Sequence, residues 1–286
     1  VYLFDAFGNL NLLYRDPIIS SATPIPVRPR RRPPVVSGHV KTTGPQSGTV
    51  LVQDVYRGLE ERKSDDIREL RIVGVSVKTH PTMNYPVMGM TRDDPGKFVL
   101  GTVPVESDGS AYFHVPSGVP FFVQALNEQG VAVQTMRSAT SVQPGQAFAC
   151  VGCHEPRNSP PISSRPLALL RDPSKLKPGP TGSWPLDFAK LVGPVLERQC
   201  VSCHQQGQEA HQFDLTPEKA YDSLVDFGSP SLRDHVLTRY NQGRSIVGQG
   251  AAQTSALLKL IDHGHYNVEL TDDDRKRLVT WMDTYA

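Results

Sequence analysis

Two short cysteine motifs constrain this chain more than any other feature of its sequence. Residues 150–154 read Cys-Val-Gly-Cys-His, residues 200–204 read Cys-Val-Ser-Cys-His, and together they use all four cysteines of the chain. The C-x-x-C-H pattern is typical of covalent attachment of a c-type haem, in which the thiols hold the porphyrin and the histidine binds the iron. The sequence therefore predicts two covalently bound haem c groups. Their predicted ligands are Cys150, Cys153, His154, Cys200, Cys203 and His204.

Two other uses of paired cysteines fit this pattern less well. A structural zinc site usually separates its two cysteine pairs by about 12–20 residues, whereas Cys153 and Cys200 lie much further apart here. A redox-active dithiol is typical of a βαβ context, and no such alternation is visible. Haem attachment therefore explains the motifs better than either alternative.

Size and charge limit the classes of partner. The chain has 286 residues, which favours two domains, and its formal net charge of +1 gives no indication of a nucleic-acid partner. No apolar run approaches the about 20 residues of a transmembrane helix, and the first residues do not resemble a signal peptide. Haem attachment through thioethers belongs to oxidising compartments. We therefore expect a periplasmic or other extracytoplasmic location, and a chain that is part of a longer or processed precursor.

Proline, turn and strand signals divide the sequence into five segments. Residues 1–14 predict a β-hairpin around Gly8-Asn9, and residues 15–47 form a linker rich in Pro and Arg. Short β-branched and aromatic runs across 48–149 predict an immunoglobulin-like β-sandwich, with a loop over 138–149. Residues 150–185 are expected to contain the first haem motif and a loop that wraps the porphyrin. The fold class is α+β and multidomain. The predicted strands are 50–52, 70–77, 98–105, 111–115, 121–126 and 131–136.

Residues 186–286 predict an α-helical, cytochrome c-like domain that carries the second haem. Pro194 suits the first turn of a helix that delivers Cys200. Thr216, Ser255 and Thr271 are each expected to cap a helix. Three aspartates after Thr271 complement the dipole of the last helix, whose apolar face repeats at helical spacing. That face comprises Leu278, Trp281, Met282 and Tyr285.

The sixth ligand of each iron decides which function the haem can have. A bound His or Met closes the iron and favours electron transfer, whereas an open position permits reaction with a small molecule. For the second haem we prefer His265, then His263, then His235, because the first two lie in a break between helices. For the first haem the candidates remain open, and the position opposite His154 can also be vacant. These candidates are a residue lent by the domain of the second haem, or one of His39, His80, His114 and Met136.

Several short segments occur in an order that resembles a known family. They are 101–105, 108–111, 115–116, 124–126, 134–138, 143–145 and 150–155, followed by Gly264-His265-Tyr266, Leu270 and Trp281-Met282-Asp283. This ordered set is similar to the C-terminal part of the hydrazine synthase alpha-subunit family. The resemblance implies that a β-propeller precedes this region and ends in residues 1–14. It also implies a β-rich middle domain and a C-terminal region with two c-type haems.

The resemblance further implies roles for the two haems. His204 and His265 correspond to a bis-histidine pair, whereas the other haem of the family carries the chemistry. In hydrazine synthase a tyrosine shortly after the motif histidine binds that iron, and the motif histidine binds zinc. In this sequence no tyrosine occurs between His154 and Tyr221. His154 is therefore expected to bind the iron in the ordinary way.

Three functions follow from these motifs. The favoured one is a dihaem module that passes electrons between redox partner proteins within a larger complex. The alternative is a hydrazine synthase-like haem enzyme, whose open first haem acts on a small nitrogen or oxygen species and whose second haem relays electrons. Its acid and base groups would come from Glu155, Arg157 and His114. In the third, the β-rich domain and the arginine-rich linker serve mainly as a docking module.

Overall fold

A computed structural model describes residues 1–32, 43–59, 66–78, 80, 85–91, 93–153 and 165–285. Contacts divide the chain into two compact units, residues 1–39 and residues 40–286. The first unit contains the antiparallel hairpin of β1 (Tyr2–Phe4) and β2 (Leu10–Leu12). Gly8 has φ +88°, and the Asp5 carboxylate accepts from the backbone N–H of Asn9 at 2.9 Å. The hairpin expected over residues 1–14 is confirmed.

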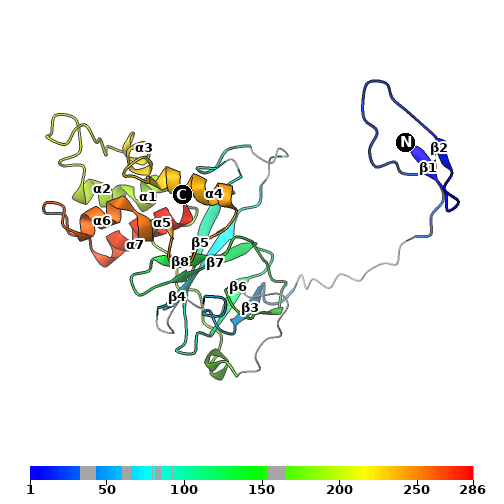
Figure 1. Ribbon diagram of the computed structural model, residues 1–286. Helices are drawn as coiled ribbons and strands as arrows, with labels where there is room; N and C mark the ends of the chain where they lie inside the picture. Colours follow the sequence, from blue (N-terminus) through cyan, green and yellow to red (C-terminus); the bar gives the residue numbers. More distant parts are fainter. Residues whose placement is uncertain are drawn as a thin grey trace. The chain divides into compact units, whose positions relative to one another are not determined.

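The second unit begins with two β-sheets that share one core (Figure 1). The three-stranded sheet has the order β6-β3-β9, and the four-stranded sheet has the order β5-β4-β7-β8. All six predicted strands are present, within a few residues of their expected ends. The strands are β3 (Ser47–Val52), β4 (Glu69–Val75), β5 (Lys97–Pro104), β6 (Ala111–Pro116), β7 (Phe121–Leu126), β8 (Ala132–Thr135) and β9 (Ala147–Cys150).

The prediction of a continuous loop before the first cysteine motif is wrong. β9 pairs in parallel with β3, in the register Val52 to Cys150. The segment Ala-Phe-Ala-Cys was missed because alanine has a low strand propensity and the run is short. Further along, residues 165–185 contain η1 (Leu167–Leu170) and run back along the sheets, where Ser174 bridges to Phe113 and Lys177 bridges to Thr102.

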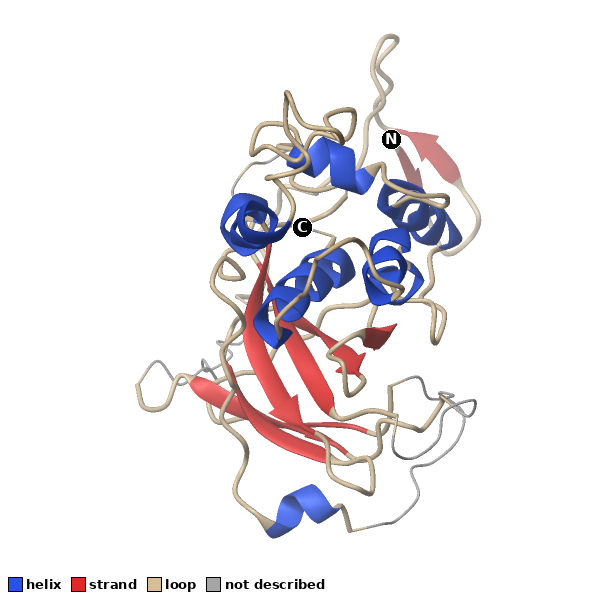
Figure 2. Ribbon diagram, turned by 90° about the vertical axis from the view of Figure 1, so that its left-hand side faces the viewer, coloured by secondary structure: helices blue, strands red, loops and turns tan. Residues whose placement is uncertain are grey.

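The second half of this unit is helical and packs on the four-stranded sheet, away from the three-stranded sheet (Figures 1 and 2). Strand β4 is buried on both faces as a result. Its Leu70 and Ile72 face the core between the sheets, and Arg71 faces the helices, where it meets Asp283 of α7. The helices are α1 (Phe188–Leu191), α2 (Gly193–Gln199), α3 (Ala220–Val225), α4 (Leu232–Gln242), α5 (Ala251–Thr254), α6 (Ala256–Asp262) and α7 (Asp272–Thr284).

Most of the expected helix starts are confirmed. Pro194 lies in the first turn of α2, and the Ser255 hydroxyl accepts from the N–H of Leu258. Thr271 and Asp274 form a reciprocal capping box that begins α7. The expected helix start at Thr216 is wrong: its hydroxyl bonds to Asp214 at 2.7 Å, and α3 begins later, at Ala220. Side-chain bonding to a preceding aspartate competes with capping.

The helical region has a core of its own, in which Trp281 and Met282 are fully buried. The α+β class is therefore confirmed as sheets followed by helices. None of the helices among the described residues has the length and apolar character needed to cross a membrane.

Candidate haem-attachment sites

The second cysteine pair lies on a helical turn. Cys200 is the C-cap of α2, and the backbone N–H groups of Cys203 and His204 both donate to the carbonyl of Cys200, at 3.1 and 3.0 Å. This turn places the two thiols about one helical turn apart, as attachment along one porphyrin edge requires. Cys203 is exposed and Cys200 is half-buried, with a pKa that burial raises to about 11.

The His204 ring is held in the orientation that an iron ligand needs. Its Nδ1 lies 3.0 Å from the carbonyl oxygen of Phe213, and the His204 carbonyl accepts from the N–H of Leu215 at 2.8 Å. A backbone carbonyl can only accept, so Nδ1 carries the proton and Nε2 presents its lone pair. Metal-binding histidines are typically oriented by such a bond. Sequence reasoning did not identify Phe213, because the bond depends on a loop that returns to the motif.

His265 lies beside His204. It follows α6 after Gly264, which has φ +95°, and precedes Tyr266, which has φ +49°. The ring centres of His204 and His265 are 6.0 Å apart, and their planes are inclined by 27°. An imidazole nitrogen binds a first-row metal at about 2 Å, and the ring centre is roughly 1 Å further away. Two imidazoles on opposite sides of one iron therefore have centres about 6 Å apart. The separation of the two ring centres matches the value for two imidazoles that share one iron.

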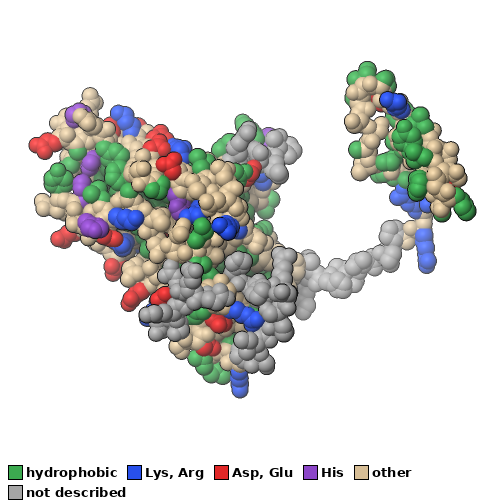
Figure 3. Space-filling model, viewed as in Figure 1, with side chains coloured by type: hydrophobic (Ala, Val, Ile, Leu, Met, Phe, Trp, Pro, Cys, Tyr) green, Lys and Arg blue, Asp and Glu red, His purple; other side chains and the backbone are tan. Residues whose placement is uncertain are grey.

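The other histidines of the helical region are engaged elsewhere. The Nδ1 of His263 is 2.7 Å from the Lys259 carbonyl on α6, and the Nδ1 of His211 is 2.8 Å from the Gln208 carbonyl. His235 is buried in α4 beside Thr254. Histidine side chains are visible on the surface over the helices (Figure 3). Of the three candidates for the second haem, the structure brings only His265 together with His204.

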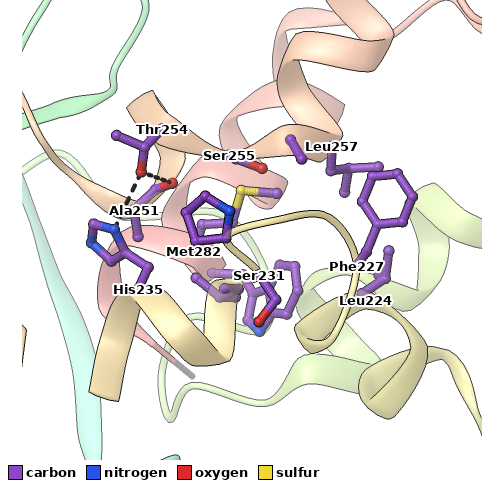
Figure 4. A pocket seen from close by; sticks show the side chains of 13 residues that line it. Leu224, Phe227, Ser231, His235, Ala251, Thr254, Ser255, Leu257 and Met282 are labelled. Carbon is purple, nitrogen blue, oxygen red and sulfur yellow. Dashed lines mark hydrogen bonds between the residues drawn. The ribbon is translucent and has the colours of Figure 1, made fainter. Parts of the chain in front are cut away.

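An apolar pocket lies between α3, α4, α6 and α7. In Figure 4, His235 and Thr254 lie at one end, Phe227 and Leu257 at the other, and Met282 between them. Trp281 also lines it, although it is fully buried. Trp281 and Met282 therefore belong to the core on which the helical region is built.

The first cysteine pair has a different setting, at the end of an edge strand. The Cys150 carbonyl accepts from the N–H of Gln53 at 2.9 Å, so pairing with β3 continues to the motif. Gly152 lies against Arg57, and a Cβ on Gly152 would be 2.6 Å from the Arg57 carbonyl oxygen. Cys150 and Cys153 pack against the core between the sheets. Burial raises the pKa of Cys153 to about 12, which is unsuited to a reactive thiolate.

Only some of the candidate ligands of the first haem lie among the described residues. His154, Glu155, Arg157 and His39 lie outside the described residues. The β3 register puts His114 opposite Thr49, on the face away from Val52 and Cys150. Met136 and His80 have other described neighbours. Met136 lines a pocket with Val236 and Tyr285, between the four-stranded sheet and the helices, and His80 is exposed against Tyr85.

A buried ion pair joins the two halves of the second unit. Arg71 Nη1 lies 3.8 Å from Asp283 Oδ2, and both side chains are almost fully buried. The Asp283 carboxylate also accepts from the N–H of Ala132 at 2.8 Å and from that of Ala252 at 3.0 Å. Burial raises the pKa of Asp283 to about 6, while Arg71 and the two N–H groups favour its charged form. Sequence analysis did not predict this junction.

These features define a class: an α+β chain whose β-rich domain and helical domain each carry a cysteine pair of the c-type pattern. Residues 65–155 match the family described as hydrazine synthase alpha subunit, middle domain, which extends through the first motif. The chain is similar to the hydrazine synthase alpha subunit, which confirms the resemblance of the ordered segments.

Two comparisons show how far this similarity extends. Hydrazine synthase subunit alpha of Kuenenia stuttgartiensis is 38% identical over 262 residues, covering 66% of this chain and 32% of the relative. The solved structure of Kuenenia stuttgartiensis hydrazine synthase is similar in fold, with a TM-score of 0.55 and 19% identity. That match covers 85% of this chain and 43% of the solved chain. The chain thus spans about a third of the curated relative.

Proposed function

We propose that this chain is the haem-bearing part of a hydrazine synthase-like enzyme. In this proposal a haem c on Cys150 and Cys153 is the open site for a small nitrogen or oxygen species, and a haem c on Cys200 and Cys203 relays electrons to or from it. The observation that carries the proposal is the family match over residues 65–155, because that segment contains the first cysteine pair. The β-rich part would be an immunoglobulin-like sandwich, and the helical part a cytochrome c-like domain.

The geometry supports different roles for the two attachment sites. When bound, haem supplies one-electron redox chemistry. At the second site, Phe213 holds His204 and a break after α6 presents His265, so these two histidines would be the protein ligands of a haem iron held there. At the first site, the described candidates His114 and Met136 lie on another face or in another pocket. A haem there with His154 as its sole protein ligand would keep one position for a small molecule.

A pure electron-transfer module is the second candidate. One observation favours it: the sequence has no tyrosine between His154 and Tyr221, where the resembled enzyme has its iron-binding tyrosine. In either case the partners would be redox proteins or further subunits of a complex, since the curated relative is named as a subunit. The location would be periplasmic or otherwise extracytoplasmic, as thioether attachment of haem implies.

Carbon monoxide binding separates the two candidates. The full chain is matured with haem, its haem content is counted, and the reduced protein is titrated with carbon monoxide while the absorption spectrum is recorded. The enzyme proposal expects about one carbon monoxide per two haems, bound at the open site. If the fully reduced dihaem protein binds none, both irons are closed and the electron-transfer module is the better account.

A further inference from the structure

A small cavity lies where strand β8 meets helix α4. It is lined by Gln134 of β8, by His235 and Arg239 of α4, and by the segment 245–250, whose Gly248 N–H donates to the Val133 carbonyl at 2.8 Å. Its volume of about 20 Å³ is large enough for one water molecule, which needs about 10–15 Å³.

Three polar atoms around this cavity are buried and unpaired. Within the described part of the chain, Gln134 Oε1, His235 Nε2 and Arg239 Nε have no hydrogen-bond partner. His235 is only 8% exposed. The other guanidinium nitrogens of Arg239 bond to Gln242 and Gln249, which leaves Nε for the cavity. Leaving a buried polar group unpaired costs about 1–3 kcal/mol, so three around one cavity indicate a bound polar species.

The hydrogen-bond pattern around His235 indicates which of its ring nitrogens donates. The Thr254 hydroxyl lies 3.0 Å from the Gly250 carbonyl, to which it donates, and 3.3 Å from His235 Nδ1. The hydroxyl proton is used in the first bond, so Nδ1–H must donate to Thr254 Oγ1. Burial and the nearby Arg239 lower the pKa of His235, which favours the neutral ring. Its Nε2 is therefore an acceptor.

The cavity thus offers two acceptors, Gln134 Oε1 and His235 Nε2, and one donor, Arg239 Nε–H. Water has two protons to donate and accepts as well, so one molecule satisfies all three atoms. An anion would bond to Arg239 but would face two lone pairs. If the Gln134 amide is turned so that its NH₂ faces the cavity, water still satisfies every group, because it can accept twice and donate once.

We propose that the cavity between Gln134, His235 and Arg239 binds one ordered water molecule that links the β-rich domain to the helical domain. The water donates to His235 and Gln134 and accepts from Arg239. It lies at the same junction as the Arg71–Asp283 pair, since Asp283 bonds to Ala132 of β8. A buried ion pair and a buried water would then hold the junction together. This water site does not depend on the proposed function.

A crystal structure of the haem-loaded chain that resolves ordered waters tests this directly, with crystals grown in bromide in place of chloride. The expected result is a water peak within hydrogen-bonding distance of all three atoms, with no anomalous bromide signal there. A bromide peak in the cavity would mean an anion site and would overturn the proposal. So would an empty cavity, or side chains that have turned to bond one another.

A variant pair tests the three-partner arrangement. Gln134→Leu removes one partner and should abolish or displace the peak, and it should lower the thermal midpoint more than Gln129→Leu does. Gln129 is the matched control because it lies in an exposed turn after β7. An unchanged peak in Gln134→Leu would overturn the assignment of Gln134. If that variant does not fold, the wild-type crystal structure alone still decides.

Discussion

The two cysteine pairs carry the same five-residue pattern but are built by different kinds of structure. Cys200 and Cys203 lie on a turn that ends a helix, and two imidazoles face each other beside them. Cys150 ends an edge strand of a sheet, and the described ligand candidates lie elsewhere. If both motifs attach haem, as we propose, the surrounding fold would decide how many protein ligands each iron receives. A closed site and an open site on one chain would then suit an enzyme with its own electron relay.

Removing each cysteine pair is the strongest test of this contrast. Cys200→Ala with Cys203→Ala should lower the haem content from two to one, because both thioether bonds are lost, and the remaining haem should bind carbon monoxide. Cys150→Ala with Cys153→Ala should also leave one haem, but one that does not bind carbon monoxide. Haem content and carbon monoxide titration measure both. Equal carbon monoxide binding by the two variants would contradict the contrast.

Opening the closed site is the next test. His265→Ala should raise carbon monoxide uptake from about one to about two molecules per chain, and it should convert one haem from low to high spin, because His204 would be the sole remaining protein ligand. His263→Ala is the matched control, since its ring is bonded to Lys259 on α6. An unchanged spectrum in His265→Ala, with a changed one in His263→Ala, would assign the ligand to His263 instead.

The difference between the sites also shows what could be predicted from the sequence. Hydrophobic alternation and turn residues predicted β3 to β8, and capping residues predicted the starts of α6 and α7, because these signals are local. β9 was missed because its alanines carry little strand signal. Arg71 was unremarkable in the sequence, since alternation on β4 predicts that it faces solvent. It is buried because a second layer, the helices, covers that face, and the layer is distant in sequence.

The same reasoning applies to the candidate sites. The motifs identified the four cysteines directly. The break between two helices identified His265 as the preferred partner of His204. The Phe213 carbonyl that orients His204 was not predictable, because any backbone carbonyl can accept. His114 and Met136 were reasonable on type alone, but the β3 register places His114 on the face away from Cys150, and Met136 lines a pocket with residues of α4 and α7.

A third prediction concerns whether the two regions unfold together. Asp283→Asn should lower the free energy of unfolding by about 1–3 kcal/mol at pH 4, because the single amide oxygen cannot accept from both the Ala132 and the Ala252 N–H groups, and one buried donor is left unpaired. Asp272→Asn, exposed at the start of α7, should cost less than about 1 kcal/mol. Denaturant unfolding followed in both regions measures this. A loss as small as that of the control would mean that the junction does not hold the halves together.

The pH dependence of the same variant sharpens this test. The pKa of Asp283 is raised from 3.8 to about 6 in the folded chain. A raised carboxyl pKa means that folding favours the protonated form, so this group's contribution to stability is complete below pH 4 and is lost as the pH rises to about 6. Asp283→Asn should remove that decline. If the variant and the wild type decline in parallel between pH 4 and 6, another group is responsible.

The smallest expected effect concerns the setting of the first cysteine pair. Gly152→Ala places a Cβ 2.6 Å from the Arg57 carbonyl oxygen, and this backbone oxygen cannot move without disturbing the segment after β3. We expect a loss of about 1–3 kcal/mol in unfolding free energy, as is typical of overpacking. Gly193→Ala is the matched control, because nothing lies within 4 Å of the added Cβ there, and alanine favours a helix.

Gly152→Ala should also affect the haem proposed at the first cysteine pair. Because Gly152 lies between the two cysteines, displacement of its backbone should alter the carbon monoxide spectrum of the first haem and leave the low-spin spectrum of the second unchanged. An edge strand has one paired side, so it should transmit the displacement to the thiols more readily than the helical turn at Cys200 would. A variant that weakens folding yet leaves both spectra unchanged would show that the strand, and not the tight contact at Gly152, fixes the position of the first haem.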